Sequence, residues 1–165
     1  MPRRIPALCG AGLAALSALA IATSAGAQAP TAQTLTVTEG ASGTSNIVDN
    51  PPKSRRHGEN TRFSVGDAIL FTSPLLDASR RRIGRVKVSC WITKAGGFAR
   101  AESDCLGVFE LSGGKLYVSA ALKFGATRTT GVVLAGTGAY QGLHGTFESV
   151  NHRDDTSTDT FNLTP

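Results

Sequence analysis

The sequence predicts an all-β fold built from short antiparallel strands. Over about eight segments, apolar residues alternate with polar ones or gather in β-branched runs, as half-buried strands do. Glycine and small polar residues separate these segments by short turns. No stretch shows a convincing amphipathic helical period. Such strands form a sandwich or a barrel, and a closed eight-stranded barrel leaves no exposed edge and can hold one small ligand.

The N-terminus reads as an export signal. A basic start at Arg3 and Arg4 precedes an apolar segment over residues 5–22 and an Ala-Gly-Ala sequence that ends at Ala27. This order is typical of a secretory signal peptide, with cleavage expected before Gln28. A membrane anchor is the alternative, but the apolar segment is short and rich in alanine. We therefore expect a secreted or periplasmic protein with no stable membrane insertion after the signal is removed.

The expected domain organisation is simple. Residues 1–27 form the signal peptide, residues 28–60 hold a first strand and a long polar loop, and residues 61–165 complete a single domain that spans 28–165. That length is enough for one domain with its own core. The 17 lysines and arginines against 12 acidic residues give a mild positive charge. No basic patch is interleaved with aromatic residues, so we expect no nucleic-acid partner.

Two cysteines remain after the signal peptide takes Cys9 away. In an exported protein Cys90 and Cys105 most simply form one disulfide, which would join two neighbouring strands. Free thiols and metal binding are the alternatives. No histidine or further cysteine lies at ligand spacing from either residue, so we expect no metal site.

The first strand and the loop after it are read from composition. Residues 35–39 alternate and are rich in threonine and valine, which predicts a strand ending at Glu39. Residues 40–60 contain glycine, serine, asparagine and a proline pair and are expected to form a loop, either mobile or a lid. Its basic run over residues 53–57 reads as a solvated turn, although a role at a lid stays open.

Residues 61–76 are expected to form one long strand with an unusual acid. Phe63, Val65, Ile69 and Phe71 share a face, and Asp67 lies on it between them. A carboxylate there is either functional or satisfied by the N–H groups of a neighbouring turn. The structural role is favoured.

The remaining strands follow at short intervals. Gly113 and Gly114 indicate a hairpin, and glycines from Gly136 to Gly145 indicate a tight connection with a bulge or bend in the strand after it. This glycine run does not fit a nucleotide-binding loop, because Gln141 stands where a third glycine would be needed and a strand follows. The expected strands are residues 83–93, 105–111, 115–124, 130–135, 142–151 and 158–163.

Three stretches resemble one protein family in order and spacing. Residues 66–75 (GDAILFTSPL) and 82–84 (RIG) followed by Cys90 resemble strands of plant allene oxide cyclases. Residues 136–145 (GTGAYQGLHG) resemble the glycine turn that these cyclases share with dirigent proteins. The match covers residues 63–150 and is similar to bacterial secreted members of the allene oxide cyclase/dirigent-like barrel family.

The resemblance implies an eight-stranded antiparallel β-barrel, calycin-like and often trimeric, so a trimer or dimer is expected. The plant cyclases close an unstable fatty-acid epoxide without a cofactor, by holding the apolar chain in a reactive shape while a carboxylate or bound water stabilises charge. Dirigent proteins orient phenoxy radicals in a similar cavity. The expected ligand is a hydrophobic or phenolic small molecule, the expected enzyme class is an isomerase (cyclase), and no cofactor is expected.

The same resemblance points to particular residues. Glu39 matches the glutamate on the first strand of the cyclases, and Ser73 occupies the position of an asparagine that holds a water. Glu39 and Ser73 are therefore the candidate catalytic residues, with Cys90 matching the strand cysteine. The alternative function is a non-catalytic secreted carrier or interaction module.

One other acid–base pair is present in the sequence. His144 and Glu148 lie on the same face of one expected strand and could exchange a proton. Their face is polar throughout, so they are read as surface residues. No serine lies in a nucleophile elbow and no Cys–His pair is spaced for catalysis.

Overall fold

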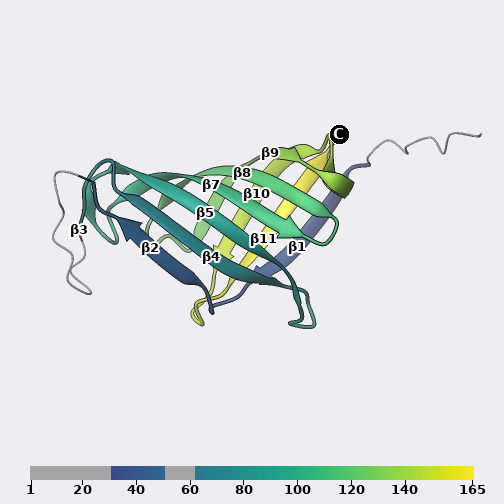
Figure 1. Ribbon diagram of the computed structural model, residues 1–165, viewed down its shortest axis with the longest axis horizontal. Coiled ribbons are helices and arrows are strands. Elements are labelled where there is room, and N and C mark those ends of the chain that lie inside the picture. The colour runs from purple at the N-terminus through teal and green to yellow at the C-terminus, as the bar shows by residue number, and fades with distance from the viewer. Residues whose placement is uncertain (1–30, 51–61) are drawn as a thin grey trace, which may run out of the picture.

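The computed structural model describes residues 31–50 and 62–165, which form a closed eight-stranded antiparallel barrel (Figure 1). The expected fold class is therefore confirmed. Beyond the strands, the described residues contain one short 3-10 turn, η2 (Gly138–Tyr140). The strands are β1 (Gln33–Glu39), β2 (Thr44–Val48), β3 (Arg62–Phe63), β4 (Ala68–Leu76), β5 (Arg82–Lys94), β6 (Gly96–Gly97), β7 (Glu102–Leu111), β8 (Gly114–Lys123), β9 (Arg128–Gly136), β10 (His144–Asn151) and β11 (Ser157–Thr164).

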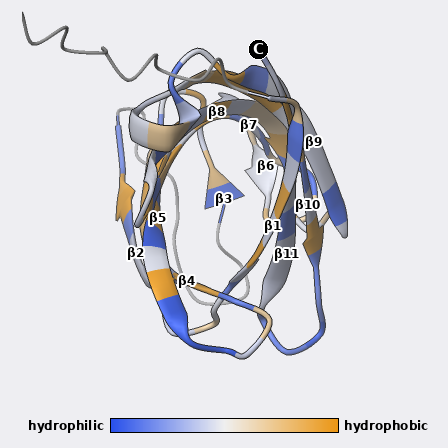
Figure 2. Cartoon of the chain, turned by 90° about the vertical axis from the view of Figure 1, so that its right-hand side faces the viewer, coloured by the Kyte–Doolittle hydropathy of each residue, from blue (hydrophilic) through white to orange (hydrophobic). Residues whose placement is uncertain are grey.

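The barrel closes between its first strand and β4. Neighbouring strands follow the order β1-β11-β10-β9-β8-β7-β5-β4, and β1 pairs back to β4 through Thr38 opposite Leu76 and Glu39 opposite Leu75. β2 then continues along the other half of β4, from Thr44 opposite Thr72 to Val48 opposite Ala68. Two pieces of chain thus share one edge of β4. Figure 2 shows the strands enclosing an interior when the barrel is viewed from its end.

Two apolar clusters fill different levels of the interior. Alternation along each strand puts one side chain in two inside, so β5 sends Val86 to one cluster and Ile92 to the other. The larger cluster is centred on Phe109, Phe147 and Phe161, whose ring centroids are 4.8 to 5.7 Å apart. The smaller cluster lies where β3 and β6 cross the opposite end of the barrel (Figures 1 and 2).

The segment expected to be a loop contains a strand. β2 lies within residues 40–60, and its side chains are exposed along its whole length. β2 is a strand because its backbone pairs with β4, not because one of its faces is buried. Its sequence therefore lacks the apolar alternation that predicts a half-buried strand. The basic run at 53–57 and the suggested lid lie outside the described residues.

The long strand expected over residues 61–76 is broken in two. β3 ends at Phe63 and β4 begins at Ala68, with a turn between them in which Gly66 has φ of 93°. Val65 is 58% exposed and so does not join the core. Asp67 lies inside because its carboxylate accepts hydrogen bonds from the backbone N–H groups of Ser64, at 2.9 Å, and Asn50, at 3.1 Å. The structural role favoured for this acid agrees with these bonds.

The glycine run at 136–145 packs on the glycine hairpin. The backbone N–H of Thr137 donates to the carbonyl of Lys115 at 2.9 Å, and that of Ala139 donates to the carbonyl of Gly113 at 2.8 Å. A Cβ on Gly114 would lie 2.0 Å from the carbonyl oxygen of Thr137, so only glycine allows this approach. The two glycine stretches therefore form one connected end of the barrel.

The N-terminal segment with the predicted signal peptide lies outside the described residues. Within residues 31–50 and 62–165, no helix is long and apolar enough to cross a membrane.

Candidate functional site

The barrel holds a cavity of about 340 Å³ between its two apolar clusters. This volume lies in the range of small-molecule sites. The wall is mostly apolar and comes from inward positions on β4, β5, β7, β8 and β10. Its apolar members include Phe71, Val88, Val118, Leu122, Phe109 and Phe147.

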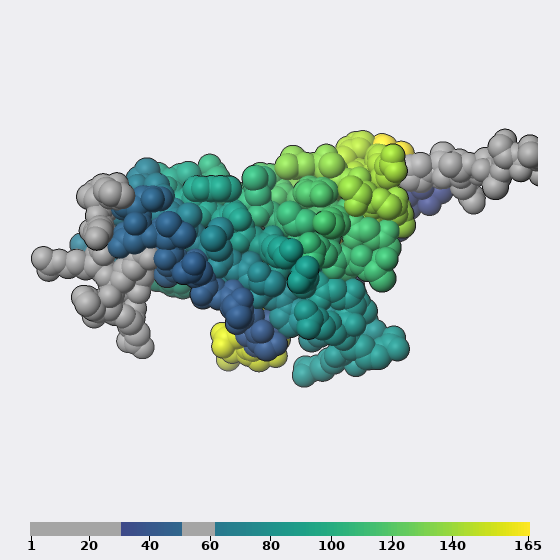
Figure 3. Space-filling view, viewed as in Figure 1, coloured from purple at the N-terminus to yellow at the C-terminus, as the bar shows by residue number. Residues whose placement is uncertain are grey.

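Polar side chains gather on one side of this cavity. They come from the end of β1, from the start of β9, from the facing ends of β10 and β11 and from the connection between β10 and β11. Figure 3 shows that connection (yellow) against the segment that leads from β1 to β2 (blue). The polar lining residues are Glu39, Thr129, Ser149, Asn151, His152, Asp155, Thr156, Ser157 and Asp159.

Asp159 is the most deeply buried acid of the site. It is 1% exposed, and neither oxygen of its carboxyl group has a hydrogen-bond partner of acceptable geometry. The hydroxyls of Ser149 and Ser157 lie near and partly stabilise the anion. Burial, reinforced by the negative charge of Glu39, dominates and raises the pKa of Asp159 to about 7.

Glu39 lies beside Asp159 because of the strand register. β1 pairs with β11 so that Glu39 is opposite Ser157 and Val37 is opposite Asp159, which makes the two acids diagonal neighbours on the inner face. Burial raises the pKa of Glu39, and hydrogen bonds from Ser73 and Ser157 partly offset the rise. The Ser157 hydroxyl donates to Oε2 of Glu39 at 3.5 Å. The two expected candidates, Glu39 and Ser73, are thus brought together, and their catalytic role stays a prediction.

The cavity reaches the surface at the β10–β11 connection. His152 and Asp155 line it there and are exposed. Nε2 of His152 lies 2.8 Å from the hydroxyl of Thr158, which fixes the ring at the mouth. These residues place a titratable rim around the polar side of the cavity.

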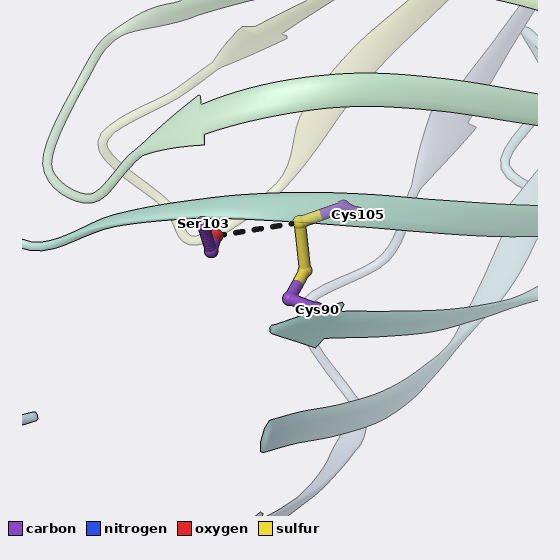
Figure 4. The surroundings of a disulfide bond; sticks show 3 residues. All are labelled: Cys90, Ser103 and Cys105. Atoms are coloured by element: carbon purple, nitrogen blue, oxygen red, sulfur yellow. Dashed lines mark hydrogen bonds between the residues drawn. A yellow bond between two sulfur atoms is a disulfide. The ribbon is translucent and has the colours of Figure 1, made fainter. Parts of the chain in front are cut away.

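The expected disulfide is present (Figure 4). Both of its cysteines line the cavity. Cys90 of β5 and Cys105 of β7 are opposite each other, with Cα atoms 4.0 Å apart. The alternatives of free thiols and of metal binding by these cysteines are therefore wrong. The Sγ of Cys105 also lies 3.5 Å from the hydroxyl of Ser103. Cys90, the residue that matches the family's strand cysteine, contacts the lumen although it is paired.

The alternative acid–base pair stays on the outside. His144 is exposed, and Glu148 pairs with Arg128 at 2.6 Å instead of reaching a cavity. Among the described residues, no three histidine, cysteine or acidic side chains are grouped to hold a metal ion.

Sequence reasoning missed Asp159, Ser157 and Ser149. A signal for two of them was present, because Ser157 and Asp159 alternate in phase with Phe161 and Leu163 on β11. An acid in phase with the apolar face of a strand is a candidate for burial. The contact with Glu39 had no such signal, since it depends on how β1 pairs with the last strand.

Comparisons with known proteins agree on the fold. No family model matches the sequence, and no curated protein sequence shows a significant match. Among solved structures, pyocyanin demethylase aligns with a TM-score of 0.62 and 18% identity over 80% of this chain and 100% of the other. AbnU, an exo-specific intermolecular Diels–Alderase, aligns with a TM-score of 0.58 and 17% identity over 81% of this chain and 98% of the other. A pterocarpan synthase dirigent protein aligns with a TM-score of 0.57 and 12% identity over 82% of this chain and 86% of the other.

These neighbours define a class by its fold. The chain shares an antiparallel β-barrel with these neighbours, which is the fold that the resemblance in the sequence implies. At these identities the likeness concerns the fold, and the chemistry has to be argued from the cavity.

Proposed function

We propose that this protein binds a hydrophobic or phenolic small molecule in its barrel cavity and acts there as a cofactor-free cyclase or isomerase. The observation that carries the proposal is a mostly apolar cavity of about 340 Å³ with a buried acid, Asp159, and a partly buried acid, Glu39, on one side. The walls would hold a flexible ligand in one shape, which lowers the entropic part of a cyclisation barrier. Glu39 and Asp159 would stabilise positive charge or move a proton, and Ser73 would position Glu39.

The structural neighbours support this proposal as analogies. One neighbour is named as an exo-specific intermolecular Diels–Alderase and another as a pterocarpan synthase dirigent protein. We extend the proposal to an exported protein, because a disulfide persists best in an oxidising compartment. The expected trimer or dimer belongs to the same proposal.

Native mass spectrometry of the exported protein is the first test. A co-purified ligand mass, or saturable binding of the neutral fluorophore N-phenyl-1-naphthylamine, is the expected result, and the same spectrum reports the oligomeric state. The absence of both a ligand mass and fluorophore binding would overturn the proposal of a binding cavity.

Catalysis needs a separate readout. An identified ligand is tested for turnover with Glu39→Gln, which keeps the shape and removes the charge. We expect Glu39→Gln to lower the rate at least tenfold while the fluorophore still binds. Binding without turnover in the natural protein would make it a carrier, which is the alternative function.

A further inference from the structure

We propose that the cavity selects an apolar amine, whose protonated nitrogen lies against Asp159 and Glu39 while its apolar body contacts the phenylalanine wall. The inference rests on the proposed binding function and adds the ligand's chemical class. It is carried by an unpartnered buried carboxyl group that faces the cavity.

The first step concerns hydrogen-bond donors. Asp159 is 1% exposed and its two oxygens lack partners, although a buried polar group without a partner costs free energy. Its cross-strand neighbours are Val37 on β1 and Ser149 on β10, and Asp159 itself is one of the residues that line the cavity. A ligand that brings N–H donors would satisfy these oxygens.

The second step concerns charge. Two carboxyl groups, Glu39 and Asp159, lie as diagonal neighbours, and no lysine or arginine is among the described residues that line the cavity. A ligand carboxylate placed there would meet like charge in a poorly solvated site. A ligand ammonium group would be attracted by the two carboxylates and could donate charge-assisted hydrogen bonds to their oxygens.

The third step concerns the rest of the ligand. Phe71, Phe109 and Phe147 line the same cavity and offer aromatic rings and apolar area. Aromatic faces also attract cations that have lost part of their hydration. An amine with an aromatic or compact apolar body therefore matches both sides of the cavity.

The pH dependence follows from competition between the ligand and a proton. The titratable groups that line the cavity with Asp159 are Glu39 from β1 and His152 and Asp155 from the β10–β11 connection. Burial raises the pKa of Asp159 to about 7, so its carboxyl group is protonated below about pH 7 and ionised above it. Affinity for an amine should rise as pH increases from 6 to 8, where the amine itself stays protonated.

The test compares three probes with the same ring system. Binding of 1-naphthylmethylamine, 1-naphthylmethanol and 1-naphthoate to the mature protein is measured by calorimetry at pH 7.5. We expect the amine to bind at least tenfold more tightly than the alcohol, and the carboxylate to bind least. Asp159→Asn should weaken amine binding at least tenfold and alcohol binding far less, because the alcohol carries no charge, whereas Asp104→Asn on the outer surface should change neither.

The outcomes separate this inference from the proposed function. Equal or tighter binding of the alcohol or carboxylate, or unchanged amine binding in Asp159→Asn, would overturn the inference while leaving a binding cavity. Asp159→Asn should also remove the rise in affinity between pH 6 and 8. If His152→Gln removes that rise instead, the acid pair is not the cation site. Failure of all three probes and of N-phenyl-1-naphthylamine would count against the cavity itself.

Discussion

Asp159 is an acidic residue at an inward-facing position of β11, where the neighbouring inward positions carry core side chains. Ser157, Asp159, Phe161 and Leu163 all point inward from β11, so the same alternation that builds the core buries the carboxyl group. Glu39 lies at the end of β1, far from Asp159 in the sequence. The site is thus two acids that the backbone holds together although neither has a cationic partner on the cavity wall.

Burial of Asp159 links stability to pH. Its pKa rises from 3.8 to about 7 on folding, so between these values the folded protein holds a proton that the unfolded chain has lost. Stability should therefore fall as pH rises from about 4 to 7, by an amount on the order of 4 kcal/mol, and level off above. Urea unfolding across this pH range measures the slope.

Asp159→Asn isolates that contribution. The amide cannot ionise, so this variant should lose most of the slope and be more stable than the natural protein at pH 8. Asp104→Asn, exposed on β7, should keep the natural slope. A slope unaltered by Asp159→Asn would show that other groups produce it.

Single strands depend on glycine where neighbouring backbones come close. Gly145 in β10 was expected to mark a bulge or bend in that strand. Its pairing with β9 and β11 continues without a register shift. A bulge lies instead in the pairing of β8 with β9, where the register shifts between Tyr117 and Val118 of β8. Gly145 is required because it has φ of 152° and a Cβ there would lie 1.9 Å from the carbonyl oxygen of Asn162.

Gly145→Ala should therefore destabilise the barrel by roughly 2 kcal/mol or more, since both the backbone angle and the contact oppose a side chain. Thermal or urea unfolding measures the change. Gly97→Ala is a matched control, because a Cβ at Gly97 meets nothing within 4 Å. That control should stay within about 0.5 kcal/mol of the natural protein, and an equal loss in both variants would contradict the explanation.

The whole barrel encloses space because small side chains occupy part of its inner wall. Gly107 and Ala120 line the cavity beside the disulfide, where larger residues would fill it. The neighbouring Ala121 points outward on the same strand and is exposed. Adjacent alanines of β8 therefore lie on opposite faces of the wall.

Ala120→Leu should fill part of the cavity. We expect at least tenfold weaker binding of N-phenyl-1-naphthylamine with an unfolding midpoint that is equal or higher, because added apolar atoms occupy empty space. Fluorescence titration and thermal unfolding measure both effects. Ala121→Leu should alter neither, and unchanged binding in Ala120→Leu would place the fluorophore elsewhere.

By itself the sequence determined local features: the alternation that makes strands, the hairpin glycines and the cysteines that form a disulfide. The resemblance also selected Glu39 and Ser73, which do lie together. Tertiary structure alone decided that β2 is a strand, that residues 61–76 are broken at a turn held by Asp67, and that Asp159 faces Glu39. The physical reason is that local periodicity sets which face a side chain occupies, whereas closure of β1 against β4 and β11 sets which distant side chains meet.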